Sequence, residues 1–218
     1  MSGNLKNTLS LNIDLQYFAS VNWFKKAVKY KYLNIIIYVP HEKVSFRNRC
    51  WLGSGHGLMR LSIPLISGRD QRTPYGKIRT AGGRWKVEHW RGIVSCYNRS
   101  PWFEHYRDEL AALFEQPTES LVEWNLSGLQ WVNRQLGGIW EMNVVDSPAI
   151  DGALSPEALR QVAGEFLPNN QASWLETYPV QRYPQVFEER NGFLPGLSIL
   201  DLLFCMGPKK TLEILKNE

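Results

Sequence analysis

The chain has 218 residues, of which 44% are hydrophobic, 12% aromatic and 21% charged. This length favours a single domain spanning residues 1–218 with residues 1–12 frayed, and nine tryptophans exclude an intrinsically disordered chain. The formal net charge of +4 is too small to indicate a nucleic-acid-binding protein by itself.

The charges are unevenly divided along the chain. Residues 41–110 contain thirteen Lys and Arg against six Asp and Glu, whereas residues 111–206 contain four against twelve. We favour the interpretation that the basic and acidic halves pack against each other. The alternative is that the basic part faces an anionic ligand, such as a nucleotide phosphate.

The three cysteines, Cys50, Cys96 and Cys205, are odd in number and widely spaced, without a CxxC pair. This pattern is typical of reduced thiols in a cytoplasmic protein. We expect no secretory signal and no membrane span, because the most apolar stretch, residues 35–39, is too short to cross a bilayer.

The first part of the chain has the pattern of one helix followed by strands. Apolar residues at approximately helical spacing predict a helix over residues 15–28, and the β-branched and aromatic run at 32–39 predicts a buried strand. Alternating patterns at 44–52 and 59–66, joined by the glycines of GSGHG, predict a β-hairpin. A third strand is predicted at 76–81.

The rest of the chain has a mainly helical period, and several predicted helices carry a Ser-Pro start or a glycine stop. The predicted helices cover residues 84–100, 101–113, 122–136, 156–167 and 198–206. A further strand is predicted at 139–145, and the two prolines in residues 178–187 predict an extended segment.

The strands are too few and too early for regular strand and helix alternation, which favours an α+β fold over a doubly wound sheet. We expect a mixed sheet from the N-terminal half, packed with the helices of residues 84–136 and with the C-terminal segment.

The stretch HEKVSFRNR is the first candidate site. If it is a strand, Arg47 and Arg49 share one face and Asn48 lies on the other. Two guanidinium forks side by side suit a phosphate or carboxylate, and a buried Asn48 amide would belong to a specific polar network. The alternative, a solvated charged face, is the more common outcome for such a strand.

His89 and Asp201 are the other candidates. His89, close to Glu88 and Arg91, has an ordinary pKa near neutrality that suits an acid or base, although a histidine hydrogen-bonded at the rim of the core is the more frequent case. Asp201 stands in an apolar helix start, where it either caps the helix or needs a cation such as Arg49. We favour capping.

No common catalytic motif is present, and no cofactor can be named from the sequence. His41, Cys50 and His56 are close in sequence but match no zinc pattern, so we expect no metal site. Nucleic-acid binding is disfavoured by the acidic second half of the chain and by the absence of a recognition signature.

Several long stretches carry a family resemblance. They are LQYFASVNWF, FRNRC, LSIPL, RWKVEHWRGIVSCYNRSPWFEHYRDEL and QVFEERNGFLPGLSILDLLFCMGP. The chain resembles the WbqC-like protein family of bacteria, in its Bacteroidetes-type form, although NIDLQYF stands where such proteins usually have a proline-bearing opening. The resemblance implies a compact α+β domain and an association with surface-polysaccharide and O-antigen assembly, and it transfers no catalytic residue.

These observations lead to a functional hypothesis: a cytoplasmic enzyme that modifies a nucleotide-linked amino sugar by acyl or aminoacyl transfer. His89 would be the base. The groups expected to bind the substrate or orient it are Arg47, Asn48, Arg49, Arg91 and Asp201. The hypothesis requires the arginines and His89 to converge on one enclosed hollow.

The alternative is a non-catalytic binding or assembly protein of the same pathway, with no deep pocket at the arginines. It predicts an exposed aromatic patch from Trp102, Trp131 or Trp174. The sequence leaves the donor, the acceptor and the oligomeric state open.

Overall fold

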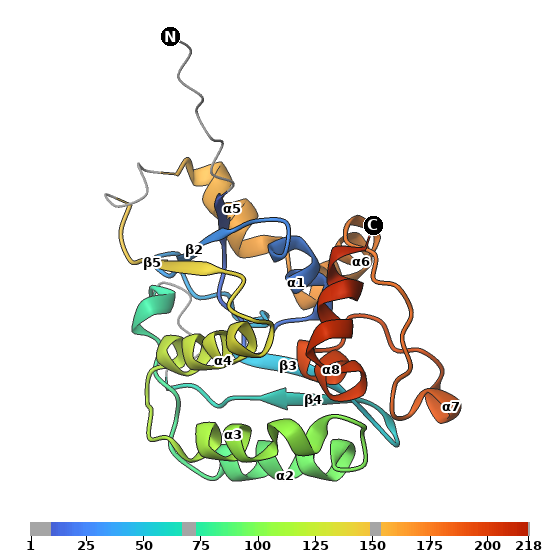
Figure 1. Cartoon of the computed structure of the whole chain (residues 1–218). Helices are drawn as coiled ribbons and strands as arrows, with labels where there is room; N and C mark the ends of the chain where they lie inside the picture. The colour runs from blue at the N-terminus through green and yellow to red at the C-terminus, as the bar shows by residue number, and fades with distance from the viewer. Residues whose placement is uncertain (1–9, 67–72, 149–153, 218) are drawn as a thin grey trace.

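The computed structural model describes residues 10–66, 73–148 and 154–217. Figure 1 shows a parallel sheet with α5 at one end of the molecule, α2 and α3 at the other end, and a β-hairpin between them. The strands are β1 (Ser10–Ile13), β2 (Tyr32–Ile36), β3 (Arg49–Ser54), β4 (Gly57–Ser62) and β5 (Glu141–Val145). The helices are α1 (Val21–Ala27), α2 (Trp85–Tyr97), α3 (Phe103–Glu115), α4 (Leu121–Gln135), α5 (Pro156–Gly164), α6 (Gln171–Thr177), α7 (Glu188–Asn191) and α8 (Ile199–Lys216), with short 3-10 helices at Tyr75–Lys77 and Pro168–Asn170.

The strands form two small sheets. One is parallel, in the order β1-β2-β5, and the other is the antiparallel β3-β4 pair. The α+β class is therefore confirmed, but the expected single mixed sheet is replaced by two separate sheets. The predicted strand at 76–81 is a 3-10 helix followed by isolated bridges at Arg79 and Thr80.

The predicted hairpin is present, and Gly57, with φ 95°, supplies the turn geometry that glycine favours. It begins at Arg49, however, so residues 44–48 are irregular rather than a strand. The prediction that Arg47 and Arg49 share one face of a strand is therefore wrong. The irregular segment buries four consecutive residues, Ser45 to Asn48, rather than alternate ones.

The N-terminal segment also differs from the prediction. Residues 10–12, expected to be frayed, belong to β1, whereas residues 1–9 lie outside the described part of the chain. The helix predicted at 15–28 begins only at Val21, where the Ser20 side chain accepts a hydrogen bond from the Trp23 amide. Residues 14–20 instead run as buried irregular chain between β1 and α1.

The later helices follow the sequence signals closely. α4 ends before Gly137 and Gly138, both with positive φ, as predicted. α8 breaks at Gly207, where φ is 71° and a Cβ would overlap the Trp102 ring, but a second helical piece continues to Lys216. The first turn of α3 follows Trp102 rather than Pro101.

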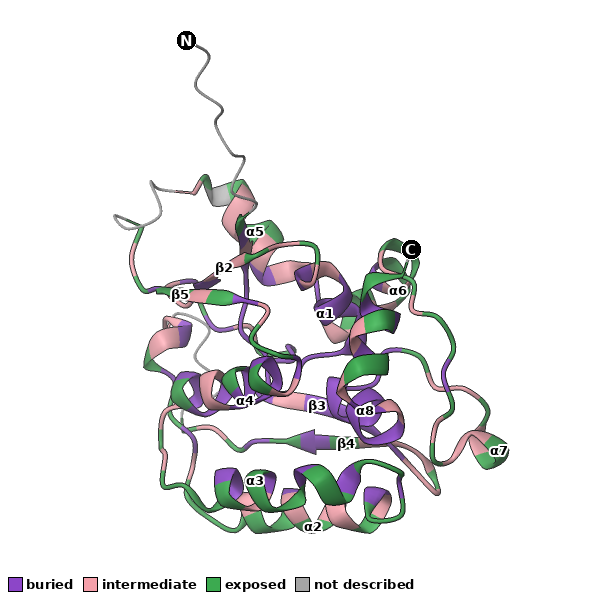
Figure 2. Ribbon diagram, viewed as in Figure 1, coloured by how far each residue is buried: buried purple, intermediate pink, exposed green. Residues whose placement is uncertain are grey.

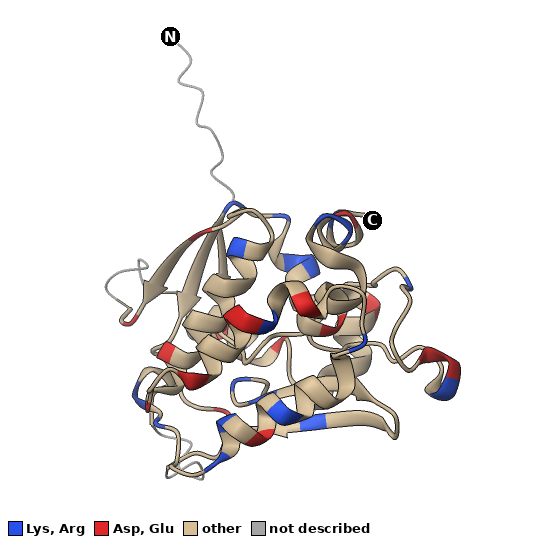
Figure 3. Ribbon diagram, turned by 60° about the horizontal axis from the view of Figure 1, so that its bottom comes forward, with Lys and Arg blue, Asp and Glu red and all other residues tan. Residues whose placement is uncertain are grey.

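One main cluster of buried apolar residues extends from Leu11 to Leu215. Figure 2 shows buried residues on β3 and on the inward sides of α1, α4 and α8. Basic and acidic residues are interspersed along the helices in Figure 3, and Arg79 of the basic half pairs with Glu119 of the acidic half. A smaller apolar cluster attaches α5 to the parallel sheet through Ile36, Val145 and Ala163.

Candidate functional site

Polar residues gather where the first strand of the parallel sheet ends. Asp14 follows β1 directly and is 2% exposed, and Gln16 is also buried. In open parallel sheets, ligands bind outside the carboxyl ends of the strands. The edge of the sheet that carries Asp14 is therefore the first place to look for a site.

Arg47 lies against this edge and is 0% exposed. Its Nη1 donates a hydrogen bond to the Pro40 carbonyl at 2.7 Å, and the guanidinium carbon lies 4.7 Å from the centre of the Tyr75 ring. Its Nε is 4.0 Å from Asp14 Oδ2, which is longer than a hydrogen bond. Among the described residues, Nε and Nη2 have no hydrogen-bond partner.

The Asp14 carboxyl has a pKa that lies close to neutral pH. Burial raises its pKa to about 6, and the charge of Arg47 and the hydrogen bond from Gln16 oppose this rise only in part. Gln16 Nε2 donates to Asp14 Oδ2 at 3.1 Å and to the Phe166 carbonyl at 3.1 Å. The carboxylate thus accepts a hydrogen bond from the Gln16 amide, and Arg47 Nε approaches the same oxygen, Oδ2.

Two further side chains fix this arrangement. Asn125 Nδ2, on α4, donates to the Arg47 carbonyl at 2.6 Å and to the Tyr75 hydroxyl oxygen at 2.7 Å. The Tyr75 hydroxyl donates to the Leu15 carbonyl at 3.0 Å. We call this group the Arg47 centre. It consists of Asp14, Gln16, Arg47, Tyr75 and Asn125.

The residues flanking Arg47 have different environments. Asn48 is buried and its Nδ2 donates to the Ile63 carbonyl at 2.9 Å, whereas its Oδ1 has no partner in the described chain. Arg49, half-buried, is the first residue of β3. Burial, together with the charges of Arg47 and Arg49, lowers the pKa of His41 to about 4.

His89 lies on the buried side of α2. Its Nδ1 is 3.0 Å from the Tyr17 hydroxyl, and it also makes a backbone hydrogen bond with Ser62. Burial lowers the pKa of His89 to about 4, so the imidazole is neutral at pH 7. Arg91, on the same helix, is exposed.

Asp201 is 1% exposed and belongs to another network. Its Oδ1 accepts a hydrogen bond from the Tyr97 hydroxyl and its Oδ2 one from the Tyr183 hydroxyl, both at 2.7 Å. Burial raises the pKa of Asp201 to about 6, against the lowering effect of both tyrosines. We call Asp201, Tyr97 and Tyr183 the Asp201 centre; the Gly53 amide donates to the Tyr97 hydroxyl oxygen at 2.9 Å.

The favoured interpretation of Asp201 as a helix cap is therefore wrong. The capping residue is Ser198, whose hydroxyl oxygen accepts from the Leu200 amide. The other interpretation paired Asp201 with a cation such as Arg49. In the structure two tyrosine hydroxyls, rather than a cation, bind the carboxylate. The sequence could not reveal these partners, since Tyr97 lies 104 residues away.

The structure separates the predicted site residues. Arg47, His89 and Asp201 belong to three networks, and within the described residues no hydrogen bond between side chains joins one network to another. Sequence analysis missed Asp14, Gln16, Tyr75 and Asn125. The available signal was a charged residue placed directly after an apolar strand, at Asp14.

Three further findings concern the described chain alone. It contains no group of three or more His, Cys, Asp and Glu side chains placed to hold a metal ion. Its helices include none that is both long enough and apolar enough to cross a membrane. The three cysteines are free thiols.

Comparison with known proteins gives a family. The model of the WbqC-like protein family matches residues 16–163, a range that includes Arg47, Tyr75 and Asn125 and ends before Asp201. Rv1507c, an uncharacterized protein of Mycobacterium tuberculosis, is 26% identical over 199 residues, which cover 79% of this chain and 83% of that protein. No solved structure matches the chain.

Proposed function

Because the chain belongs to the WbqC-like protein family, we propose that it works in the assembly of bacterial surface polysaccharide of the O-antigen type. In this proposal it is a cytoplasmic enzyme that transfers an acyl or aminoacyl group to a nucleotide-linked amino sugar. Three free thiols support a reducing compartment.

The observation that carries the proposal is the unpaired fork of Arg47. Nε and Nη2 are the two donors of one side of the guanidinium, and that side matches the two oxygens of a phosphate or carboxylate. A buried donor without a partner is unfavourable, so an anion placed there would gain more than at a solvated arginine. Because Arg47 is 0% exposed, a ligand can reach it only when residues that cover it move.

Asp14 is the proposed proton acceptor. When an amine attacks an acyl carbon, a C–N bond forms, the bond from the acyl carbon to the donor's carrier breaks, and the carrier leaves with the electron pair. The nitrogen must lose a proton in this step, and a carboxylate with a pKa of about 6 can take it near neutral pH. This role replaces the one first expected for His89. We assign His89 a positioning role, since its ring holds Tyr17, whose amide donates to the Phe46 carbonyl beside Arg47.

Two of the other four candidates, Asn48 and Arg49, follow Arg47 in the chain and act next to this centre. Asn48 holds the segment that carries Arg47 to Ile63, and Arg49 adds positive charge near His41. Arg91 and Asp201 lie outside the Arg47 centre and are not assigned to the substrate.

The test measures ligand binding by the full chain in a thermal-shift assay. The ligands are UDP-N-acetylglucosamine, UDP and free N-acetylglucosamine. We expect both nucleotides to raise the melting temperature in a concentration-dependent manner, because a ligand stabilises the state that it binds. Arg47→Lys keeps the charge and removes the fork, and should weaken binding at least tenfold.

Arg91→Ala is the matched control, since it removes an exposed arginine and should leave binding unchanged. Near-ultraviolet circular dichroism checks that each variant is folded. Equal affinity of Arg47→Lys and the parent protein would refute the anchoring role.

The second candidate is a non-catalytic binding or assembly protein, and the complete burial of Arg47 favours it. Its predicted aromatic patch is reduced to Trp102, which is 37% exposed, whereas Trp131 and Trp174 are buried. Failure of every sugar nucleotide to shift the melting temperature would favour this candidate.

A further inference from the structure

Phe18 has an unusual backbone conformation. Its φ is 40°, and among the described residues other than glycine it is the one with a positive φ. This region of backbone space is crowded for a bulky residue, because its Cβ approaches the following carbonyl oxygen. Residues are found there only where the surrounding contacts hold the chain, so the contacts of Phe18 are the evidence to examine.

The chain just before Phe18 is fixed to the Arg47 centre by two hydrogen bonds. The Leu15 carbonyl accepts one from the Tyr75 hydroxyl at 3.0 Å. The Tyr17 amide donates the other to the carbonyl of Phe46 at 2.9 Å, one residue before Arg47. The direction of the chain at residues 15–17 is therefore set by this centre.

The chain from Phe18 onward is fixed to the start of α8 instead. The Phe18 carbonyl accepts a hydrogen bond from the Ser198 hydroxyl at 2.7 Å. The Ala19 carbonyl accepts one from the Ile199 amide at 2.9 Å. The change from one set of partners to the other thus falls at Phe18, and the bonds on both sides hold its positive φ.

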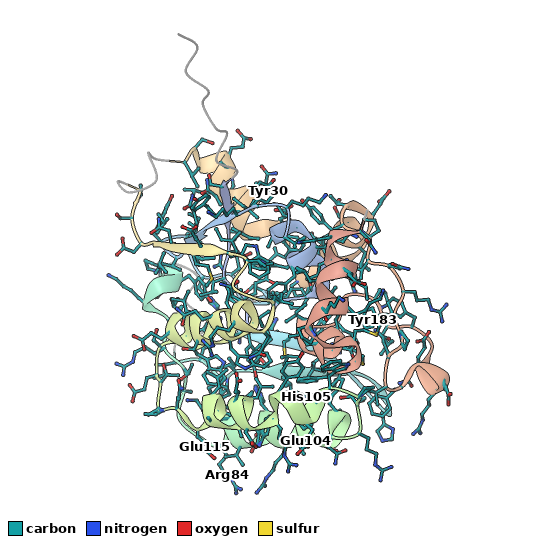
Figure 4. All side chains as sticks on the ribbon, viewed as in Figure 1. Tyr30, Arg84, Glu104, His105, Glu115 and Tyr183 are labelled. Atoms are coloured by element: carbon teal, nitrogen blue, oxygen red, sulfur yellow. The ribbon has the colours of Figure 1, made fainter. Side chains whose placement is uncertain are left out.

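The Phe18 side chain is seated in a notch on α4. A Cβ on Gly128 would lie 3.2 Å from Phe18 Cε1, and its three nearest contacts outside its own stretch of helix would all be atoms of this ring. Phe18 is 4% exposed, and the Trp131 ring meets its ring edge to face at 6.4 Å between centres. Figure 4 shows the region around α4 densely filled with side chains. Gly128 follows Asn125 of the Arg47 centre by about one helical turn.

We propose that Phe18 is a positioning residue of the Arg47 centre. Its strained backbone aims Tyr17 and the residues before it, among them Asp14. Its ring, seated against Gly128, sets the separation between that segment and the turn of α4 that carries Asn125. Side chains of a site are held in one geometry by supports of this kind. The value of this geometry for binding a substrate rests on the proposed function, whereas the positioning itself does not.

The first measurement compares Phe18→Ala with Phe18→Gly in the full chain by urea denaturation. Both variants lose the ring, so they differ only in the Cβ that makes a positive φ unfavourable. Glycine adopts this φ readily, so the equilibrium constant for unfolding should be about five to thirty times larger in Phe18→Ala.

Ala19→Gly is the control, because φ is not positive at this neighbouring position and glycine should there favour unfolding. Equal stability of the two Phe18 variants, or lower stability of Phe18→Gly, would overturn the strain.

The second measurement follows the geometry of the centre through the pKa of Asp14, taken from the carbon-13 shift of its carboxyl group. Burial raises this pKa to about 6, and the charges of Arg47 and Glu165 also act on it. Phe18→Gly should leave the pKa at about 6, whereas Phe18→Ala should lower it toward the ordinary value of 3.8 as water reaches the carboxylate. The same pKa in both variants would overturn the positioning role.

Gly128→Ala keeps the ring and fills the notch, which provides a test if the Phe18 variants do not fold. It should lower the melting temperature by about 2 °C or more, because the ring cannot move away without its strained backbone. Gly92→Ala, inside α2, is the matched control, since its methyl group would meet only side-chain atoms of Met59 and Leu61 at 3.5 Å or more. A melting temperature of Gly128→Ala as high as that of Gly92→Ala would overturn the seating of the ring.

A third arm measures the affinity for UDP-N-acetylglucosamine by isothermal titration calorimetry. Phe18→Ala should bind about fivefold more weakly than Phe18→Gly, or weaker still, because its Arg47 centre is no longer held in one geometry. Equal affinity of the two variants would overturn the link between the strain and binding. A parent protein that does not bind the nucleotide would count against the proposed function, while the unfolding and pKa comparisons would still decide the positioning role.

Discussion

The structure contains two buried aspartates whose carboxylates are stabilised by different partners. Asp14 and Asp201 are 2% and 1% exposed, and burial raises the pKa of each to about 6. Asp201 receives one hydrogen bond on each oxygen from a tyrosine hydroxyl. Asp14 is bonded by Gln16 and lies 4.0 Å from the nearest nitrogen of Arg47.

This comparison teaches that burial and a raised pKa do not identify a functional carboxylate. The Asp201 centre has its donors and acceptors matched, and it ties α2, α8 and the chain before α7 together. The Arg47 centre has two donors left over, on a side chain with no exposed surface, and two buried acceptors without a partner in the described chain, Gln16 Oε1 and Asn125 Oδ1. The unpaired polar atoms, rather than the raised pKa, separate a candidate binding site from a structural network.

The largest effect on stability is expected from a substitution that disrupts the Arg47 centre. Arg47→Met should lower the free energy of unfolding by about 3 to 5 kcal/mol, because Asp14 is left without its cation. The double variant Asp14→Leu with Arg47→Met should recover most of that loss, as apolar replacements of a buried pair often do. Urea denaturation measures both, and a double variant as unstable as the sum of the single changes would contradict coupling of the pair.

The next effect concerns the Asp201 centre. Tyr183→Phe and Tyr97→Phe should each lower the free energy of unfolding by about 1.5 to 3 kcal/mol, the range for a hydrogen bond to a charged group. Tyr97→Phe should cost more, because the Gly53 amide also loses its acceptor. Tyr30→Phe is the control, and a change above about 0.5 kcal/mol there would show that the measurement reports general packing.

These tyrosine variants should leave sugar-nucleotide binding unchanged in the thermal-shift assay. A loss of binding comparable to that in Arg47→Lys would mean that the two centres act as one site, against the separation of their networks.

The smallest effect is a change in how the free energy of unfolding depends on pH. Both aspartates should contribute to it with the same sign. A carboxyl whose pKa is raised from 3.8 to about 6 binds a proton more tightly when folded, so its contribution favours the folded state below pH 4 and is lost as the pH rises to 6. Asp14→Asn and Asp201→Asn should each remove up to about 1.4 kcal/mol per pH unit of that downward slope.

Urea midpoints measured from pH 4 to 7 provide this slope. His41 and His89, with pKa values lowered to about 4, contribute the opposite slope, which both variants retain. An unchanged slope in either variant would show that its aspartate titrates as in the unfolded chain.

The sequence predicted the regular elements better than the site, for a physical reason. The period of α2 and the glycines after α4 are local signals, and both helices agree with the prediction. The irregular segment before β3 alternates like a strand, so the pattern misplaced Arg47. The partners of Asp14 and Asp201 come from segments distant in sequence, and no local rule reports which side chains meet there.

The parallel sheet has a consequence for the order in which the protein folds. β5 begins at Glu141 and must pair beside β2, which ends at Ile36, so about a hundred residues separate two neighbouring strands. At about 5 to 20 residues per second on the ribosome, β1 and β2 wait on the order of ten seconds for their third partner. During that interval the apolar strands are open to aggregation, and a chaperone that shields the emerging N-terminal third would raise the yield of native protein.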